Sequence, residues 1–207
     1  MHRVAAVSGS PTVRRFRADD EAAVVPLLYE SSGGMYDRFA GTRALALRTI
    51  TRALRREGTT ASADVVWVAD LDGRLAGAMA AMPYEEWTPR AHRFLRTTLL
   101  SIPPWRWPAA LWLYRSSDRL APEPPRTSLY VDSLATAPGL RRRGVGRALL
   151  DQAEQMARDA ELRTVALDTW QDNRPARALY LGAGFEEVAH TPPHGVMPGG
   201  VSLVKEL

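Results

Sequence analysis

Three consecutive arginines and two glycines stand where an apolar stretch of the sequence gives way to a helical pattern. The segment LYVDSLATAPGLRRRGVGRALL spans residues 129–150, with arginines at 141–143 followed by Gly144 and Gly146. The first amides of a helix lack intrahelical acceptors and lie at the positive end of the helix dipole. Glycines let a phosphate approach such amides, and neighbouring arginines add positive charge. The junction therefore predicts a binding site for a pyrophosphate or another polyanion. The structural alternative is a solvated connection that happens to contain glycine.

Two common phosphate-binding motifs fit this junction poorly. A P-loop needs a lysine after its last glycine, and the sequence has a single lysine, Lys205, far along the chain. The dinucleotide-binding fingerprint G-x-G-x-x-G/A has Leu149 at its third position. Asp168, one strand later, stands where that fold places a ribose-binding acid. A dinucleotide site is therefore weakened rather than excluded.

Other catalytic patterns have little support in the sequence. Histidines at positions 2, 92, 190 and 194 show no metal-ligand spacing, and the chain has no cysteine. Nothing matches the G-x-S-x-G turn of a serine hydrolase. We therefore expect neither a metal site nor a Ser-His-Asp triad.

Two motifs, in this order, resemble the GNAT family of acetyl-CoA-dependent N-acetyltransferases. The first is [R/Q]-x-x-G-x-[G/A], which Arg141, Gly144 and Gly146 fit, after a segment similar to L-x-V-x-P with Thr136 in place of valine. The second is N-x-x-A-x-x-[FLY]-Y-x-x-x-G-F, which DNRPARALYLGAGFEEV matches. Together they cover residues 129–188. The resemblance implies the GNAT fold and acetyl transfer from acetyl-CoA to an amine.

The resemblance also implies which residues contact acetyl-CoA. Its pyrophosphate is expected on the amides that follow the arginines, and its pantetheine beside the preceding strand, paired like an added strand. The residues concerned are Leu134, Ala135, Thr136, Arg141, Arg142, Arg143, Gly144, Val145, Gly146, Arg147, Asn173 and Tyr180. Asn173 is equally well placed to cap the helix that follows it.

Acetyl transfer to an amine requires a neutral amine, a stabilised thioester oxygen and a proton for the leaving thiolate. By resemblance, a backbone N–H near Leu134 or Ala135 polarises the carbonyl group, and Tyr180 is the general acid. The alternative for Tyr180 is a core aromatic with its hydroxyl at the surface.

The sequence leaves the general base open. Family members often carry an acid in the strand before the arginine motif, so Asp132 is the candidate, acting directly or through a water. Ser133 stands where other members have Glu or Asp. Alternation along a strand places Asp132 on one face with Tyr130, Leu134 and Thr136. A purely structural hydrogen bond for Asp132 and a water chain without a single base are alternatives.

The segment 83–125 differs in texture from the rest of the chain, because it holds four of the six tryptophans and several prolines. We interpret it as a helical insertion where acceptor-binding loops of the family vary. Glu85 and Glu86, at its start, are alternative bases. Candidate acceptor-binding residues are Glu85, Trp87, Trp105 and Ser133. An auxiliary core or an amphipathic membrane-surface segment are the other interpretations of the tryptophans.

The periodicity of the sequence predicts the elements that position these residues. Strands are expected at 12–16, 128–136, 164–169, 185–191 and 201–207, with a hairpin at 65–82 that turns at Asp72-Gly73. Helices are expected at 18–30 with Asp19 as N-cap, and at 42–56, 92–100, 109–120, 144–160 and 175–181. This order predicts an α/β protein of α+β type, with a mixed central sheet of six to seven strands flanked by helices.

Composition bounds the class of protein. The chain has 207 residues, 45% hydrophobic and 24% charged, which predicts one GNAT domain at 12–207 behind a flexible leader at 1–11. Its net charge is +4, but the arginines are spread among acids, so we expect no nucleic-acid partner. No apolar run approaches the roughly 20 residues of a membrane helix. Without cysteines or a secretory signal, we expect a cytoplasmic protein. We expect it to be a monomer or a homodimer.

Three functions are compatible with these features. The first is an enzyme that acetylates a primary amine of a small molecule or peptide by direct attack in a ternary complex. The second is a non-catalytic acyl-CoA-binding or sensing protein of the same fold. The third is a nucleic-acid-binding module that uses the arginines.

Overall fold

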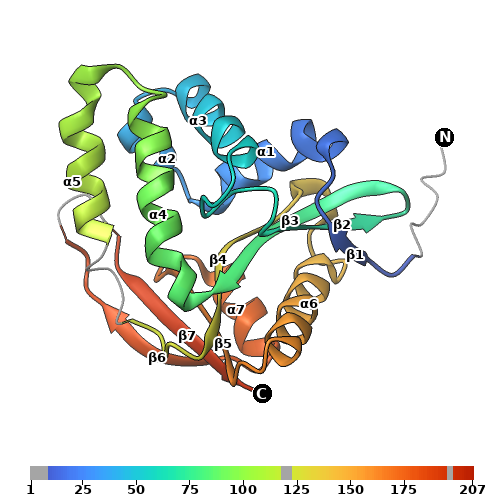
Figure 1. Ribbon diagram of the computed structural model, residues 1–207. Coiled ribbons are helices and arrows are strands. Elements are labelled where there is room, and N and C mark those ends of the chain that lie inside the picture. The colour runs from blue at the N-terminus through green and yellow to red at the C-terminus, as the bar shows by residue number, and fades with distance from the viewer. Residues whose placement is uncertain (1–8, 118–122, 195–197) are drawn as a thin grey trace.

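The protein is built on a seven-stranded mixed sheet (Figure 1). The computed structural model describes residues 9–117, 123–194 and 198–207, so most of the expected leader lies outside the described residues. The strand order is β1-β2-β3-β4-β5-β7-β6, and every neighbouring pair is antiparallel except β4 and β5. The strands are β1 (Thr12–Arg15), β2 (Val66–Leu71), β3 (Arg74–Pro83), β4 (Ser128–Thr136), β5 (Thr164–Trp170), β6 (Glu186–Thr191) and β7 (Gly200–Glu206). The expected fold class is confirmed.

The β2–β3 hairpin turns where the sequence predicts. Asp72 and Gly73 connect the strands with φ angles of +50° and +72°. Two successive positive φ angles match the right-handed twist of the flanking strands, and Asp-Gly tolerates them well. The turn therefore fixes the register of the two long apolar strands.

Helices cover both faces of the sheet (Figure 1). One face carries α1 (Glu21–Ser31) and α3 (Arg43–Arg55), which share a buried cluster with apolar residues of β2 and β3. The opposite face carries α6 (Val145–Asp159) and α7 (Arg174–Gly182), whose apolar residues form a second cluster. In α6 the apolar residues recur at four-residue steps, and Leu149 and Ala153 on this face are fully buried.

The first helix begins differently from the prediction. Asp19 is not its N-cap, because residues 18–20 form a short 3-10 turn and Asp20 is the residue that precedes α1, without a side-chain cap hydrogen bond to that helix. The Asp20 carboxylate accepts the backbone N–H of Arg17 at 2.7 Å and pairs with Arg14 at 2.7 Å. Asp20 therefore fixes the 3-10 turn that leads into α1 rather than the first amides of α1 itself.

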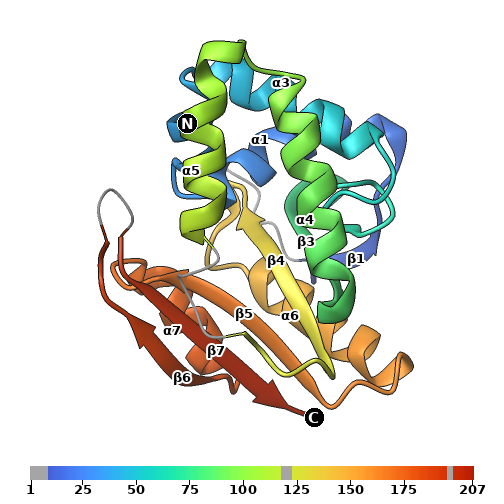
Figure 2. The same cartoon turned by 60° about the vertical axis from the view of Figure 1, so that its left-hand side comes forward.

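Three further helices, α2 (Met35–Ala40), α4 (Tyr84–Leu99) and α5 (Trp107–Ser117), stand on the α1–α3 side of the sheet (Figures 1 and 2). The sequence analysis missed α2, which lies between Gly34 and Gly41, both with φ of +87°. It also started α4 eight residues late, and the structure places Pro89 inside that helix. The predicted end of α5, at 118–120, lies outside the described residues. The helical segment shares the core of the domain, since Ala110 and Leu113 of α5 belong to the same cluster as α1 and α3.

The strands β4 and β5 separate halfway along their length, as Figure 2 shows. They pair in parallel from Ser128 opposite Thr164 to Val131 opposite Leu167, and the pairing ends there. From that point β4 continues to Thr136 beside β3 alone. The result is an open gap in the middle of the sheet.

A β-bulge in β4 lies at this point of separation. Ala80 pairs with Ser133 and Ala81 pairs with Val131, so Asp132 has no opposite residue in β3. The extra residue reverses the alternation of side chains. Leu134 therefore packs with the α6 cluster, on the opposite face from Asp132, and the single face expected for Asp132 and Leu134 is wrong.

Candidate functional site

A cavity of about 630 Å³ lies between α2, α4, α5 and the separating ends of β4 and β5. It reaches from the helical segment down to the start of α7, and so joins two regions that the sequence analysis treated apart. Its lining includes Tyr36, Phe39, Tyr84, Trp87, His92, Phe94, Leu95, Leu113, Tyr114, Tyr130, Asp132, Ser133, Leu134, Asp168, Asn173, Ala176 and Tyr180. The cavity thus brings together six of the residues singled out from the sequence: Trp87, Asp132, Ser133, Leu134, Asn173 and Tyr180.

Asp132 presents its carboxylate to this cavity from the bulge. The indole Nε1–H of Trp87 donates to its Oδ1 at 2.8 Å. Burial raises the pKa of Asp132 from 3.8 to about 6; the Trp87 hydrogen bond opposes this rise, and the nearby Asp168 charge adds to it. A carboxyl group with such a pKa is ionised at neutral pH and still basic enough to accept a proton.

A second carboxylate, that of Asp168, lies on β5 directly after Leu167, the last β5 residue that pairs with β4. The hydroxyl of Tyr130 donates to Asp168 Oδ2 at 2.8 Å, and burial raises the pKa of Asp168. The ring of Tyr130 makes edge contacts with Tyr84 and Trp87, at centroid distances of 5.7 and 6.0 Å. These three aromatic rings therefore hold Asp132 and Asp168 in place at the floor of the cavity.

Tyr180 reaches the cavity from α7. Its side chain is 6% exposed and packs near Phe185, with ring centroids 6.1 Å apart. Burial raises the pKa of Tyr180 to about 12. The hydroxyl therefore keeps its proton throughout the neutral range, as a proton donor must.

Asn173 begins α7 and caps it. Its Oδ1 accepts the backbone N–H of Ala176 at 3.4 Å, and its Nδ2 donates to Thr169 Oγ1 at 3.1 Å. The capping role that the sequence left open is therefore confirmed. The cap also fixes the direction in which α7 presents Tyr180.

The free edge of β4 supplies backbone groups to the gap. The N–H of Ala137 donates to Ala76 O on the β3 side at 2.8 Å. Because backbone groups alternate along an antiparallel strand, the groups of Leu134 and Thr136 point away from β3. They face the side of β4 from which β5 has separated.

The arginine–glycine junction forms an exposed turn at the start of α6. Arg142 and Gly144 both adopt left-handed conformations, with φ of +63° and +80°. All three arginines and Gly144 are exposed, and no described side chain caps the helix. A Cβ at Gly144 would meet only Pro11 Cγ, at 4.0 Å, so the space above the turn is open. Arg147, one turn on, instead pairs with Asp151 at 2.7 Å.

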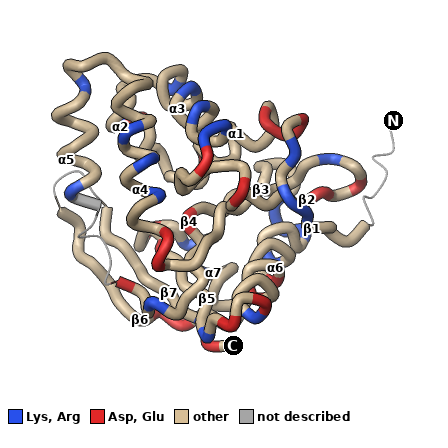
Figure 3. The backbone as a smooth tube through the Cα atoms, viewed as in Figure 1, with Lys and Arg blue, Asp and Glu red and all other residues tan. Residues whose placement is uncertain are grey.

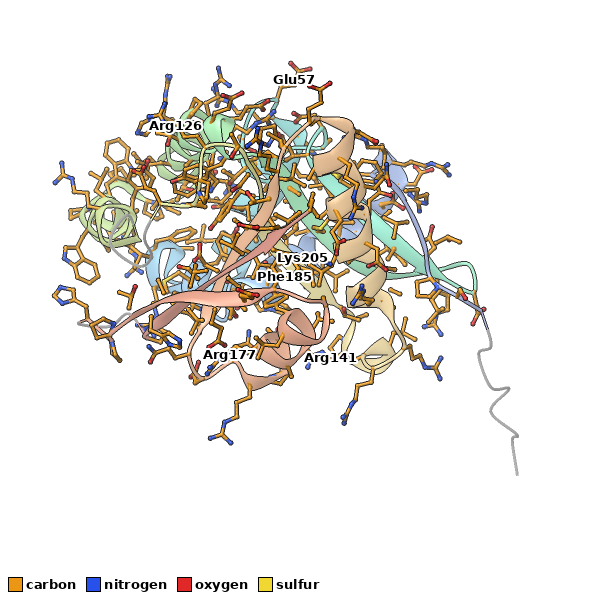
Figure 4. All side chains as sticks on the ribbon, turned by 90° about the horizontal axis from the view of Figure 1, so that it is seen from below. Glu57, Arg126, Arg141, Arg177, Phe185 and Lys205 are labelled. Atoms are coloured by element: carbon orange, nitrogen blue, oxygen red, sulfur yellow. The ribbon has the colours of Figure 1, made fainter. Side chains whose placement is uncertain are left out.

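This junction lies on the same side of the molecule as α7. Figure 4, seen from below, places Arg141 and Arg177 along one edge of the view.

The second glycine of the motif lies inside α6 and faces α7. Gly146 is buried, and a Cβ there would lie 2.8 Å from Leu179 Cδ2. The absence of a side chain at Gly146 therefore permits close packing of α6 on α7.

Two predicted acceptor-binding residues lie outside the cavity. Glu85 is exposed on α4, and Trp105 is 79% exposed in the turn before α5. Glu85 lies outside because it is on another face of α4. The face of α4 toward the cavity carries Tyr84, Trp87, Thr88, Ala91 and Leu95. Glu86 is also turned away and pairs with Arg90 at 2.8 Å. The bases proposed at 85 and 86 are therefore not part of the site.

The sequence analysis missed several aromatic residues of the cavity. Tyr36 comes from the unpredicted α2, and Phe94 and Tyr84 come from α4. Burial raises the pKa of Tyr36, and the charge of Asp132, which lines the same cavity, adds to the rise. The spacing of residues 84, 87, 91 and 95 is the helical signal that could have revealed this wall of the site.

Some classes of site have no support in the described part of the chain. No group of three or more acidic or histidine residues there could hold a metal ion. No helix among the same residues is long and apolar enough to cross a membrane. Figure 3 shows acidic and basic residues interspersed over helices and strands rather than gathered on one element.

Comparison with known proteins gives one family and many similar folds. The model of the acetyltransferase (GNAT) family matches residues 36–185. An N-acetyltransferase from Staphylococcus aureus Mu50 is 17% identical with a TM-score of 0.72, over 94% of this chain and all of that one. The protein Ard1 from Thermoplasma volcanium is 19% identical with a TM-score of 0.59, over 96% and 99% of the two chains. At these identities the likeness is one of fold. No curated protein matches the sequence.

Proposed function

Because the chain belongs to the GNAT family of acetyltransferases, whose members use acetyl-CoA as co-substrate, we propose that it acetylates a primary amine of a small molecule or peptide. The amine attacks directly in a ternary complex. One observation carries the proposal: Asp132 and Tyr180 line the same cavity, at the gap where β4 leaves β5. A base and an acid are therefore available where an added strand could pair.

The residues present fit acetyl-CoA in two places. The exposed turn at Gly144 offers backbone amides and three exposed guanidinium groups to a diphosphate. The outward backbone groups of Leu134 and Thr136 offer pairing to an extended amide-containing chain. Bound acetyl-CoA supplies an activated acyl thioester, which an amine can attack without further activation of the acyl group.

Asp132 removes the proton of the attacking ammonium group, directly or through a water. Its carboxylate suits this task because burial brings its pKa to about 6, close to the pH at which it must work. Trp87 holds one oxygen by its 2.8 Å hydrogen bond, which leaves the other oxygen for the proton.

Tyr180 gives a proton to the leaving thiolate, and a backbone N–H of β4 stabilises the carbonyl oxygen. The buried hydroxyl remains protonated at neutral pH because its pKa is raised to about 12. Of the two amides considered from the sequence, that of Leu134 faces the gap, by the alternation from Ala137. The residue in this role is therefore Leu134 rather than Ala135.

The experiment has two stages. Thermal unfolding with acetyl-CoA, CoA and a DNA duplex first measures which ligand stabilises the fold. Release of CoA thiol on a panel of primary amines then measures transfer. Stabilisation by acetyl-CoA together with amine-dependent release supports the proposal. Stabilisation without release from any amine would point to the non-catalytic acyl-CoA-binding protein, and stabilisation by DNA alone would refute both.

A further inference from the structure

The cavity has an uneven distribution of charge and apolar surface. Two of its three described acidic lining residues, Asp132 and Asp168, lie where β4 and β5 separate, and the third, Glu123, precedes β4. The walls that rise from there are aromatic or aliphatic, with Tyr36, Phe94, Leu95 and Leu113 among them. None of the described residues that line the cavity is an arginine or a lysine, although the whole chain carries 27 such residues.

We infer that the acceptor is a primary amine on an apolar or aromatic body that carries no acidic group. This inference rests on the proposed function and names the substrate class of the same site. The amine lies toward the carboxylates, and the body lies between α2, α4 and α5.

A carboxylate beside the amine would be strongly disfavoured. In an α-amino acid the acid group stands next to the amine, and would therefore enter the region of Asp132 and Asp168. No guanidinium or ammonium group among the described lining residues is available to pair with it. A buried anion next to two like charges, with no arginine or lysine among the described lining residues to pair with it, is strongly disfavoured. The site therefore selects against amino acids by repulsion as much as it selects for amines by fit.

The apolar walls supply the matching attraction. The rings of Tyr36 and Phe94 lie 6.0 Å apart and those of Tyr36 and Phe39 lie 5.4 Å apart, so α2 and α4 meet in a continuous aromatic wall. The volume of about 630 Å³ exceeds what a compact alkylamine fills. A body with an aromatic ring would bury its apolar surface against this wall.

The first test compares pairs that differ by one carboxylate: 2-phenylethylamine against phenylalanine, and tryptamine against tryptophan. We expect CoA release with each amine, and a kcat/KM at least about 100-fold lower with each amino acid. Equal or faster acetylation of the amino acids would overturn the inference and leave the proposed function standing.

The second test applies if no CoA is released with any of these compounds. It separates a failure of the proposed acetyl transfer from a failure of the inferred acceptor class. Protection against thermal unfolding is measured with CoA present and 2-phenylethylamine or phenylalanine added. Protection by the amine alone supports the inferred acceptor class even in a protein that does not turn over. Absence of protection and of release with both decarboxylated amines overturns it.

The third test uses variants of α4. Leu95→Ala removes part of the apolar wall, so we expect kcat/KM for 2-phenylethylamine to fall roughly tenfold, with little change for ethylamine. Leu99→Ala, one turn along the same helix and outside the cavity lining, is the matched control. Equal losses for both amines in Leu95→Ala, or equal losses in both variants, would contradict a role for this wall in acceptor binding.

Discussion

The carboxylate of Asp132 is subject to opposing influences. Burial and the neighbouring Asp168 favour its neutral form, and the indole of Trp87 favours the charged form. The balance gives a group that changes its charge near pH 6, inside a cavity where an amine must lose a proton. Neither a surface aspartate nor a fully apolar pocket would produce this behaviour.

Asp132→Asn is expected to lower kcat/KM for an amine acceptor by about 100-fold or more, the usual loss when a general base is removed. In the wild type the rate falls as the pH drops below about 6, because protonated Asp132 accepts no proton. The acceptor amine titrates in both proteins. The ratio of wild-type to variant rates therefore isolates Asp132 and should rise to a plateau above pH 6.

Asp64→Asn is the control for this change, because Asp64 pairs with Arg90 outside the cavity. Its rate should follow the wild type. A ratio for Asp132→Asn that stays flat between pH 5 and 8 would assign the base to another group or to a water chain.

Tyr180→Phe should lower turnover by about 10- to 100-fold, while the Kd of acetyl-CoA changes by less than about twofold. The ring keeps its packing beside Phe185, and only the proton donor is lost. Tyr29→Phe loses a hydroxyl that donates to Asp37 away from the cavity, and should keep full turnover. An unchanged rate in Tyr180→Phe at all pH values would leave Tyr180 as a core aromatic, the alternative that the sequence left open.

At the scale of elements, two discontinuities in secondary structure make the site. β4 leaves β5 after Val131, and α6 begins after a left-handed Gly144. Each discontinuity leaves backbone groups without partners inside the fold, and an extended ligand with a diphosphate can use both sets.

Gly144→Glu is expected to weaken acetyl-CoA binding by more than about 100-fold, because the side chain fills the open space above the turn and adds a like charge. Gly73→Glu is the matched control. Gly73 also has a positive φ, +72°, and no atom within 4 Å of its Cβ position, but it lies in the β2–β3 turn. Both variants carry the same backbone strain, so equal affinities, measured by calorimetry, would refute the phosphate site.

The sequence predicted the elements that carry strong local signals. The strands around the site and α6 combine apolar periodicity with glycine punctuation, and their positions are confirmed within a few residues. It failed where tertiary structure overrides local preference. α2 is a short helix between two left-handed glycines, and Pro89 remains inside α4. The bulge at Asp132 has no signal in the sequence, where the strand is consistent with regular alternation. These three features shape the helical side of the cavity. Of the four candidate acceptor-binding residues, only Trp87 and Ser133 line it.

At the scale of the whole molecule, the half-buried carboxylate of Asp132 lowers the free energy of unfolding at neutral pH. The pKa of Asp132 is raised on folding, so its contribution to stability is fully present below its ordinary value of 3.8. That contribution is lost as the pH rises through about 6. A shift of about two units in a half-buried group corresponds to about 1–3 kcal/mol above pH 7.

Asp132→Asn should therefore raise the free energy of unfolding by about 1–3 kcal/mol at pH 7.5 and by close to zero at pH 4. Asp20→Asn is a control of opposite sign. The hydrogen bond from Arg14 holds the pKa of Asp20 below its ordinary value, so this variant should be less stable than the wild type at pH 7.5. Its deficit should shrink as the pH falls. Urea unfolding at the two pH values measures both. An Asp132→Asn variant that is less stable than the wild type at pH 7.5 would contradict a destabilising effect of the ionised Asp132 carboxylate.

The most direct test of amine acetylation in a ternary complex is the initial rate of CoA release with acetyl-CoA and 2-phenylethylamine both varied. The chain has no cysteine to carry an acetyl group, and base and acid line one cavity. Reciprocal plots should therefore intersect, as they do when both substrates must be bound before transfer. Parallel lines, which indicate an acetylated enzyme, or release that does not depend on the amine, would contradict the account.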